Sequence, residues 1–250
     1  MNLITKYLTN NPCYKKGLTI KVKGLMLHSV GVNQPNPLVF VNSWNKSSFS
    51  DACVHGFIGI DDVYITLPCM EKSGVAHRGW HGGGSSNDTH IGIEMCEPSQ
   101  IKYVGGASFT ISDKTSAVKF VEQVTKNAVD LFATLCIFHN LNPKTDIISH
   151  AEGNKRGIAS AHADPDHLWR GLGMNYNMDK FRADVENKIK IMKGEIMDNT
   201  PHDWGKDAVN WAVNNKIMTG DDKGNLKLSS PITREEFVVM LKRFYDKFGK

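Results

Sequence analysis

The sequence predicts an α/β domain in which helices flank a central mixed β-sheet, followed by a small α-helical module. Short apolar segments alternate with helical patterns from residue 1 to about residue 190. The composition then becomes polar over residues 191–203, which include Gly194 and Pro201. Two amphipathic helical patterns follow. We therefore expect a first domain over 1–190, a linker over 191–203 and a helical module over 204–250.

The first half of the domain predicts short strands and one helix. Residues 24–29, GLMLHS, predict a strand that ends in polar residues, and residues 35–46 predict a helix opened by prolines and an asparagine. Residues 54–60 and 63–67 are apolar and flank Asp61 and Asp62, so they predict a β-hairpin. Residues 90–96 alternate, which places Gly92 and Glu94 on one face of a strand and Ile91, Ile93 and Met95 on the other.

The second half of the domain predicts the longest helix, over residues 113–139, with an apolar stripe and Ser112 or Asp113 as its cap. Pro143 limits its extension, residues 146–150 predict another short strand, and residues 177–193 predict a closing helix. In the module, residues 204–217 and 232–248 predict two helices, the second opened by a capping box of Thr233 and Glu236. A helix pair of about 50 residues has little core of its own. We expect it to need the first domain or a second copy of itself.

The composition is that of an ordinary globular protein. Of its 250 residues 40% are hydrophobic and 22% charged, and the formal net charge is +4. This charge is too mild for a typical nucleic-acid binder, and no apolar run is long enough for membrane insertion. The five cysteines form no CxxC pair and the N-terminus shows no secretory signal. We therefore expect a protein made in a cytoplasm, which acts outside only after something else releases it.

Residues 149–169, SHAEGNKRGIASAHADPDHLW, hold three histidines, two aspartates and a glutamate. Imidazole nitrogens and carboxylate oxygens are zinc ligands, and a catalytic zinc site keeps one position open. His28 and His150 each fall at the end of a predicted strand, and Asp164 follows in the loop. The residues alone leave two readings open, a polar surface loop or part of a metal site.

Three segments together resemble the zinc-dependent N-acetylmuramoyl-L-alanine amidases of the amidase-2 family, which share a fold with T7-type lysozyme and the animal peptidoglycan recognition proteins. The segments are GLMLHSVG, GVAHRGWHGGGSSNDTHIGIEMCE and SHAEGNKRGIASAHADPDHLW, in that order. They match the family's strand-end histidine, its "WHxG" and "IGIE" segments, and its later histidine and "DP". The likeness covers about residues 15–185, and each motif alone would be weak.

The resemblance implies a set of site residues. It implies that His28, His150 and Asp164 bind Zn²⁺ and that Glu94 takes a proton from the attacking water and passes it to the leaving amine. His162 matches a position that is lysine or histidine in the family, and it would donate a hydrogen bond to the oxyanion. His167 is either a fourth ligand in a resting state or packs with Trp169. Residues expected to bind substrate are Trp80, His81, Asn87 and His55.

The chain departs from the family at one position. T7-type lysozymes carry a catalytic tyrosine just before the histidine of the second strand, and here that position is Val54. Glu94 must then carry the base role. His55, the next residue, either lines the groove or is a buried, hydrogen-bonded histidine. Gly92, beside Glu94, leaves room for a ligand over the strand.

The C-terminal module resembles one S-layer-homology (SLH) repeat, with signatures around Trp211, at residues 217–220 and at residues 232–236. Such repeats usually act in threes to bind wall polysaccharide. A single repeat implies weak binding of a secondary cell-wall polymer, assembly of several chains into a homo-oligomer, or a packing role. Met192 and Met197 would also permit an internal translation start that yields a free tail.

The sequence therefore predicts a zinc amidase that cuts the bond between N-acetylmuramic acid and L-alanine in bacterial peptidoglycan, as a phage or prophage endolysin would. A non-catalytic peptidoglycan-binding protein of the same fold is the alternative, although such relatives typically lose a zinc ligand. A cysteine hydrolase using Cys53 or Cys96 is a third class. Neither cysteine falls at a helix start, where a thiolate would be favoured.

Overall fold

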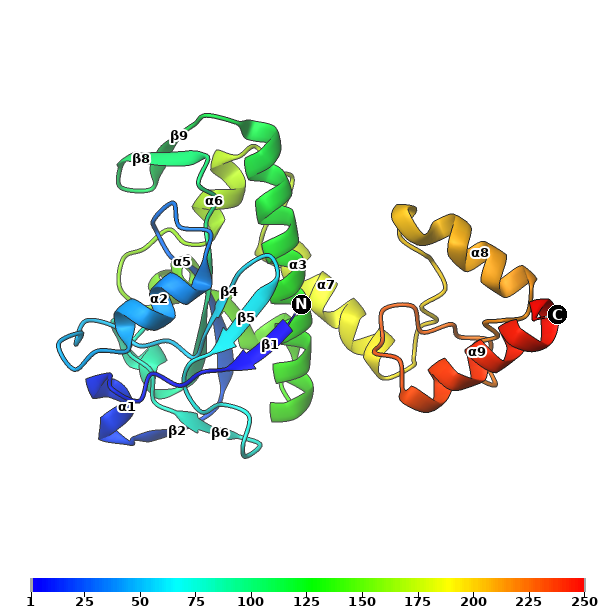
Figure 1. Ribbon diagram of the computed structural model, residues 1–250. Helices are drawn as coiled ribbons and strands as arrows, with labels where there is room; N and C mark the ends of the chain where they lie inside the picture. Colours follow the sequence, from blue (N-terminus) through cyan, green and yellow to red (C-terminus); the bar gives the residue numbers. More distant parts are fainter. Residues whose placement is uncertain (1, 250) are drawn as a thin grey trace. The chain divides into compact units, whose positions relative to one another are not determined.

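The chain forms two compact units, described for residues 2–249 by a computed structural model. The first unit ends at Glu186 and the second begins at Asn187 (Figure 1). The division falls inside helix α7 (Met178–Met192), which is continuous across it.

The first unit is built on a mixed sheet of six strands in the order β1-β5-β4-β7-β3-β10. The strands are β1 (Asn2–Thr5), β3 (Gly24–Ser29), β4 (Gly56–Ile58), β5 (Asp62–Ile65), β7 (His90–Met95) and β10 (Ile147–Ser149). Strand β3 lies parallel to both β7 and β10, and β7 lies parallel to β4. Their carboxyl ends therefore meet at one edge of the sheet. The predicted hairpin is confirmed by the antiparallel β4–β5 pair.

Helices cover both faces of this sheet (Figure 1). Helix α2 (Pro37–Trp44) packs through Phe40, whose ring stacks 5.2 Å from that of Phe57. On the other face lies α3 (Lys114–His139), where Thr125 contacts the Met95 sulfur. The predicted strand over residues 90–96 is confirmed as β7, in which Ile91, Ile93 and Met95 are fully buried. Asp113 caps α3, one of the two predicted capping residues.

Several elements were not predicted from the sequence. They are β1, α1 (Pro12–Lys16), the two-stranded pair of β2 (Thr19–Lys21) with β6 (Val75–His77), and the hairpin of β8 (Ile101–Gly105) with β9 (Ser108–Ile111). Short helices also interrupt the regions expected to be loops: α4 (Pro143–Asp146), α5 (His150–Lys155), α6 (Asp166–Gly171) and η1 (Ser85–Asp88). None of these elements is longer than six residues, so the pattern of apolar residues alone does not reveal it.

The second unit contains η2 (Asp203–Gly205), α8 (Lys206–Asn214) and α9 (Arg234–Phe248). The capping box of Thr233 and Glu236 is confirmed. Trp211 of α8 stacks on Phe248 of α9 with ring centroids 5.7 Å apart. Among the described residues, none on α8 or α9 is buried. Asp198, in the predicted linker, is bonded to this unit, since its backbone N–H donates to the Asn225 side chain at 2.8 Å.

No helix within the described range 2–249 combines the length and the apolarity that a membrane crossing requires.

Candidate metal centre and active-site groove

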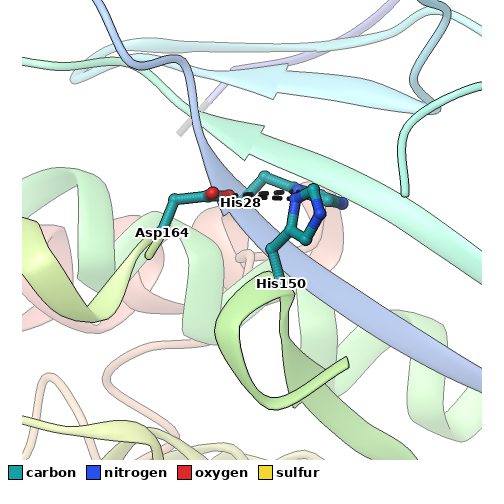
Figure 2. A group of neighbouring side chains, drawn as sticks. All are labelled: His28, His150 and Asp164. Carbon is teal, nitrogen blue, oxygen red and sulfur yellow. Dashed lines mark hydrogen bonds and ion pairs between the residues drawn. The ribbon is translucent and has the colours of Figure 1, made fainter. Parts of the chain in front are cut away.

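Three side chains from separate parts of the chain converge at the carboxyl edge of the sheet (Figure 2). His28 lies near the end of β3, and His150 is the first residue of α5, directly after β10. Asp164 arrives from the loop between α5 and α6, and Figure 2 shows it pointing at both imidazoles. All three are buried. The structure thus brings together the three residues expected to bind zinc.

The spacing of the ligand atoms fits a tetrahedral zinc ion. The Nδ1 atoms of His28 and His150 are 3.1 Å apart, and they lie 3.2 Å and 3.6 Å from Oδ2 of Asp164. Ligands bound about 2.0–2.1 Å from a tetrahedral ion are roughly 3.3 Å from one another. Two neutral imidazoles and one carboxylate also leave a coordination position for water or substrate.

A chain of hydrogen bonds fixes the tautomer of His28. The carbonyl of His90 can only accept, so Nε2–H of His81 donates to it at 3.1 Å. Burial lowers the pKa of both His81 and His28, which are therefore neutral. Nδ1 of His81 must then accept from Nε2–H of His28, 3.0 Å away. This leaves a lone pair on Nδ1 of His28, directed at the centre of the cluster.

A second chain of hydrogen bonds fixes the tautomer of His150. The Ser160 hydroxyl donates to the Gly82 carbonyl at 3.2 Å and lies 3.1 Å from Nε2 of His150. With its proton given to Gly82, the hydroxyl accepts from Nε2–H and leaves a lone pair on Nδ1 of His150. Two nitrogen lone pairs and a carboxylate oxygen therefore face one another without a proton between them. Such an arrangement is repulsive unless a cation lies among them, and this supports a metal site.

Asp164 is held as a carboxylate. Burial acts to raise its pKa, and the charged form of His162 beside it acts to lower the pKa, which lies well below its usual range. An ionised carboxylate is the form that binds a divalent metal.

Glu94 lies beside the candidate ligands. It is the register partner of His28 across the β3–β7 ladder, and both line the same cavity. Its Oε2 atom is buried and has no hydrogen-bond partner among the described residues. Burial, followed by the charges of Asp164 and Glu97, raises the pKa of Glu94 well above its usual value. A carboxylate of raised pKa is a stronger base, which suits the predicted proton-transfer role.

His162 and His167, the other two histidines of residues 149–169, lie in different surroundings. The His162 ring stacks 4.4 Å from that of His150, its Nδ1 lies 3.6 Å from Asp164, and its side chain is 60% exposed. The contact with the Asp164 carboxylate raises the pKa of His162 and favours its protonated, donating form. His167 instead bonds through Nε2 to the Tyr103 hydroxyl at 2.7 Å. It lies outside the three-ligand cluster, and its ring contacts those of Tyr103 and Phe109.

A groove of about 800 Å³ opens over the cluster. Trp80, His81 and Asn87, three of the four residues expected to bind substrate, line it together with Asn154 and Ser160. Of the two readings for His55, the structure supports the buried, hydrogen-bonded histidine and not the substrate-binding one. This side chain is fully buried and does not line the groove, because its Nε2–H donates to the His77 carbonyl at 2.8 Å and its Nδ1 accepts from Gly92 at 3.0 Å.

The space above Gly92 is also filled differently from the prediction. A Cβ atom at Gly92 would lie 2.4 Å from the His81 ring. The glycine thus makes room for the imidazole that supports His28, and the room is not left for a ligand. Asn87 shapes the turn before this site, since its Oδ1 accepts from the backbone N–H groups of His81 and Gly82.

The cysteines do not support the third functional class. Cys53 and Cys96 are fully buried. A hydrogen bond with Cys13, together with burial, raises the pKa of Cys53, and burial raises that of Cys96. Their thiols are not nucleophiles in this environment.

Sequence reasoning missed two contributors to the site. Ser160 holds His150, and Glu97 is fully buried, where it accepts from the Gly31 N–H at 3.0 Å and from the Tyr103 hydroxyl at 2.7 Å. Tyr103 also lines the groove and fastens the β8–β9 hairpin beside it. Ser160 and Glu97 both lie inside the quoted segments, but the resemblance assigns no role to either, because their roles depend on contacts between distant segments.

Comparison with known families gives two matches. The family model described as Amidase_2, N-acetylmuramoyl-L-alanine amidase, matches residues 18–167. The model described as the S-layer homology domain, SLH, matches residues 198–238. None of the curated protein sequences compared with the chain matches it.

Solved structures share the fold of the first unit. The Staphylococcus aureus hydrolase AmiA, solved in complex with its ligand, aligns with a TM-score of 0.56 at 20% identity over 78% of this chain and 87% of that one. A mutant endolysin from Bacillus subtilis aligns with a TM-score of 0.51 at 21% identity, over 74% and 99%. The catalytic domain of XlyA gives 0.51 at 19% identity, over 74% and 99%. The predicted mixed sheet flanked by helices is thereby confirmed.

Proposed function

Since the chain belongs to the Amidase_2 family of N-acetylmuramoyl-L-alanine amidases, we propose that it uses a zinc ion to hydrolyse the amide bond between N-acetylmuramic acid and L-alanine in bacterial peptidoglycan. The observation that carries this proposal is the convergence of His28, His150 and Asp164 beneath a groove that Glu94 also lines. All three candidate ligands are in place, which favours an enzyme over a non-catalytic binding protein of the same fold.

Each side chain of the site has a separate role in the proposed hydrolysis. His28, His150 and Asp164 would hold the ion, which supplies Lewis acidity to the scissile carbonyl and makes water acidic enough to attack near neutral pH. Glu94 accepts the proton of the attacking water and delivers it to the nitrogen of L-alanine as the C–N bond breaks. His162, exposed at the rim, donates a hydrogen bond to the carbonyl oxygen as it gains negative charge.

The second unit is proposed to keep the enzyme on the wall. The SLH match supports binding of a secondary cell-wall polymer, and a cavity of about 530 Å³ lined by Lys227, Glu235 and Arg243 offers polar groups for one. Large apolar side chains on α9, among them Phe237 and Leu241, are more than half exposed. They support assembly through a second copy of residues 204–250.

We further propose that the protein is an endolysin, made in a host cytoplasm and active on the wall after release. One structural neighbour is itself described as an endolysin. All five cysteines are free and buried, which agrees with folding in a reducing compartment.

Digestion of purified peptidoglycan tests the reaction. Cleavage should expose new L-alanine amino groups and no new reducing sugar ends. A chelator should abolish the release and added zinc restore it, whereas a thiol alkylator should leave most activity. Appearance of reducing ends would contradict the amidase reaction, and chelator-resistant cleavage would contradict the zinc dependence. If His150→Ala left wall lysis unaltered, the binding-only function would replace this proposal.

A further inference from the structure

The net positive charge of the chain comes from its first fifth. Residues 1–50 contain six lysines and no aspartate or glutamate. The remaining residues hold 24 lysines and arginines against 26 acids, the totals of 30 and 26 less those six lysines. The net charge of +4 therefore comes entirely from this segment, in which no acidic residue offsets the lysines.

Four of these lysines form one surface, which we call the basic face: Lys15, Lys16, Lys21 and Lys23. Lys15 and Lys16 end α1, and only Gly17 and Leu18 separate α1 from β2. Along β2 and beyond, Ile20 and Val22 are buried, while Lys21 and Lys23 are exposed, so both lysines point to solvent.

Both elements of the basic face pack on the same strand. Tyr14 of α1 lies 5.2 Å from the His77 ring of β6, and Lys21 of β2 pairs with Val75 of β6. Figure 1 shows α1, β2 and β6 together at one end of the first unit.

Two carboxylates close to β6 have partners other than these lysines. Glu71 accepts the Tyr7 hydroxyl, and Asp88 pairs with Arg78 at 2.6 Å. No ion pair to a carboxylate within residues 2–249 is found for Lys15, Lys21 or Lys23. Their ammonium groups are thus available to a partner in solution.

The basic face runs up to the active-site groove. Nζ of Lys16 lies 4.7 Å from the centre of the Trp80 ring, a cation–π contact. Trp80 lines the groove and its backbone pairs with that of Cys53. A glycan strand that enters the groove past Trp80 would therefore continue alongside the four lysines.

We propose that the basic face binds the phosphodiester polymers that are covalently joined to wall glycan, and so orients the catalytic unit on strands that carry them. Such a polymer presents a row of separated anions, and ammonium groups on flexible stems bind these through many weak contacts without a shaped pocket. Continuity with the groove favours a partner attached to the substrate over an anionic membrane. The inference rests on the proposed function for the choice of polymer, but its test measures binding and needs no catalysis.

The test compares the full chain with two triple variants. Lys15→Gln, Lys21→Gln and Lys23→Gln together remove three charges of the basic face and keep the Lys16–Trp80 contact. Lys102→Gln, Lys119→Gln and Lys155→Gln remove three exposed charges from β8, α3 and α5, so the net charge is matched. Each protein is sedimented with walls of one phosphodiester-rich strain, either intact or stripped of the polymer with hydrofluoric acid, over a series of salt concentrations.

The basic-face variant should bind intact walls on the order of tenfold less tightly than the native chain at low salt, with a shallower salt dependence. On stripped walls the native chain and both variants should bind alike. The control variant should behave as the native chain on both. All three should cleave a soluble muropeptide at the same rate. If the native chain fails to cleave that muropeptide, the proposed function fails, whereas the binding result still decides this inference.

Three results would overturn the proposal. The first is an equal loss of wall binding in the two triple variants. The second is equal binding of the native chain to intact and stripped walls, with no effect of the basic-face substitutions. The third is an effect of the basic-face substitutions on binding to phosphatidylglycerol vesicles that is larger than their effect on binding to intact walls. The last result would assign the face to a membrane.

Discussion

In the histidine cluster, the tautomer of a candidate metal ligand depends on residues that are distant in the sequence. His28 offers its Nδ1 lone pair because His81 occupies the other ring nitrogen, and His81 is held in turn by the His90 carbonyl. The sequence predicted the ligand set from motif positions. It could not predict that His81 supports His28 or that His55 is buried, because both facts depend on which ring fits against Gly92.

At the same scale, Glu94 gives a sharp prediction for catalysis. Glu94→Gln keeps the shape of the side chain but removes its ability to accept a proton. The rate of muropeptide cleavage should fall by roughly 10²- to 10⁴-fold, as for loss of a general base. Zinc content per chain, measured by plasma mass spectrometry, should stay the same as in the native protein. A variant that keeps activity within a few-fold would remove Glu94 from the reaction.

At the scale of elements, the start of α5 fixes the second histidine. Ser149 caps this helix by accepting from the Glu152 N–H at 3.1 Å, and Glu152 accepts from the Ser149 N–H at 3.0 Å. Arg182 of α7 then binds both oxygens of Glu152. The sequence predicted a strand followed by a polar loop here. A helix of six residues carries too few apolar positions to be recognised, so the capping box was the only available signal.

Two capping boxes in one chain provide a matched pair of variants. Ser149→Ala should lower the free energy of unfolding of the first unit by about 1 kcal/mol, the usual contribution of an N-cap. It should also weaken zinc binding, because His150 is the residue that follows. Thr233→Ala removes the same kind of cap from α9 and should leave zinc affinity unchanged. Urea unfolding and zinc titration against a competing chelator measure the two effects. Equal zinc affinity in both variants would show that the cap does not position His150.

At the scale of the whole molecule, the sequence predicted the order and type of the main elements better than their connections. Strands β3 and β7 and helix α3 were recognised from periodicity, because each is long enough to show its pattern. The β2–β6 pair and the β8–β9 hairpin were not, since each joins short, partly exposed segments. The candidate metal ligands could be predicted because they lie in motifs, whereas the residues that support them could not.

Shortening the chain tests the two-unit organisation. A protein ending at Lys193 keeps α7 and its buried residues Phe181 and Val185, and removes η2, α8 and α9. It should cleave a soluble muropeptide at the native rate and unfold with the same midpoint for the first unit. Its sedimentation with intact walls should decrease, because the SLH-like module is lost. Loss of soluble activity would mean that the first unit requires the second to fold.

The close approach of His81 to Gly92 has a consequence for how this chain can vary. With a Cβ atom placed 2.4 Å from the imidazole, no residue larger than glycine fits at position 92 while His81 is kept. In a randomly mutated population selected for wall lysis, side chains larger than glycine at position 92 should be recovered only with a smaller residue at position 81. The two sites would then be inherited as a covarying pair, although neither transfers a proton in the proposed reaction.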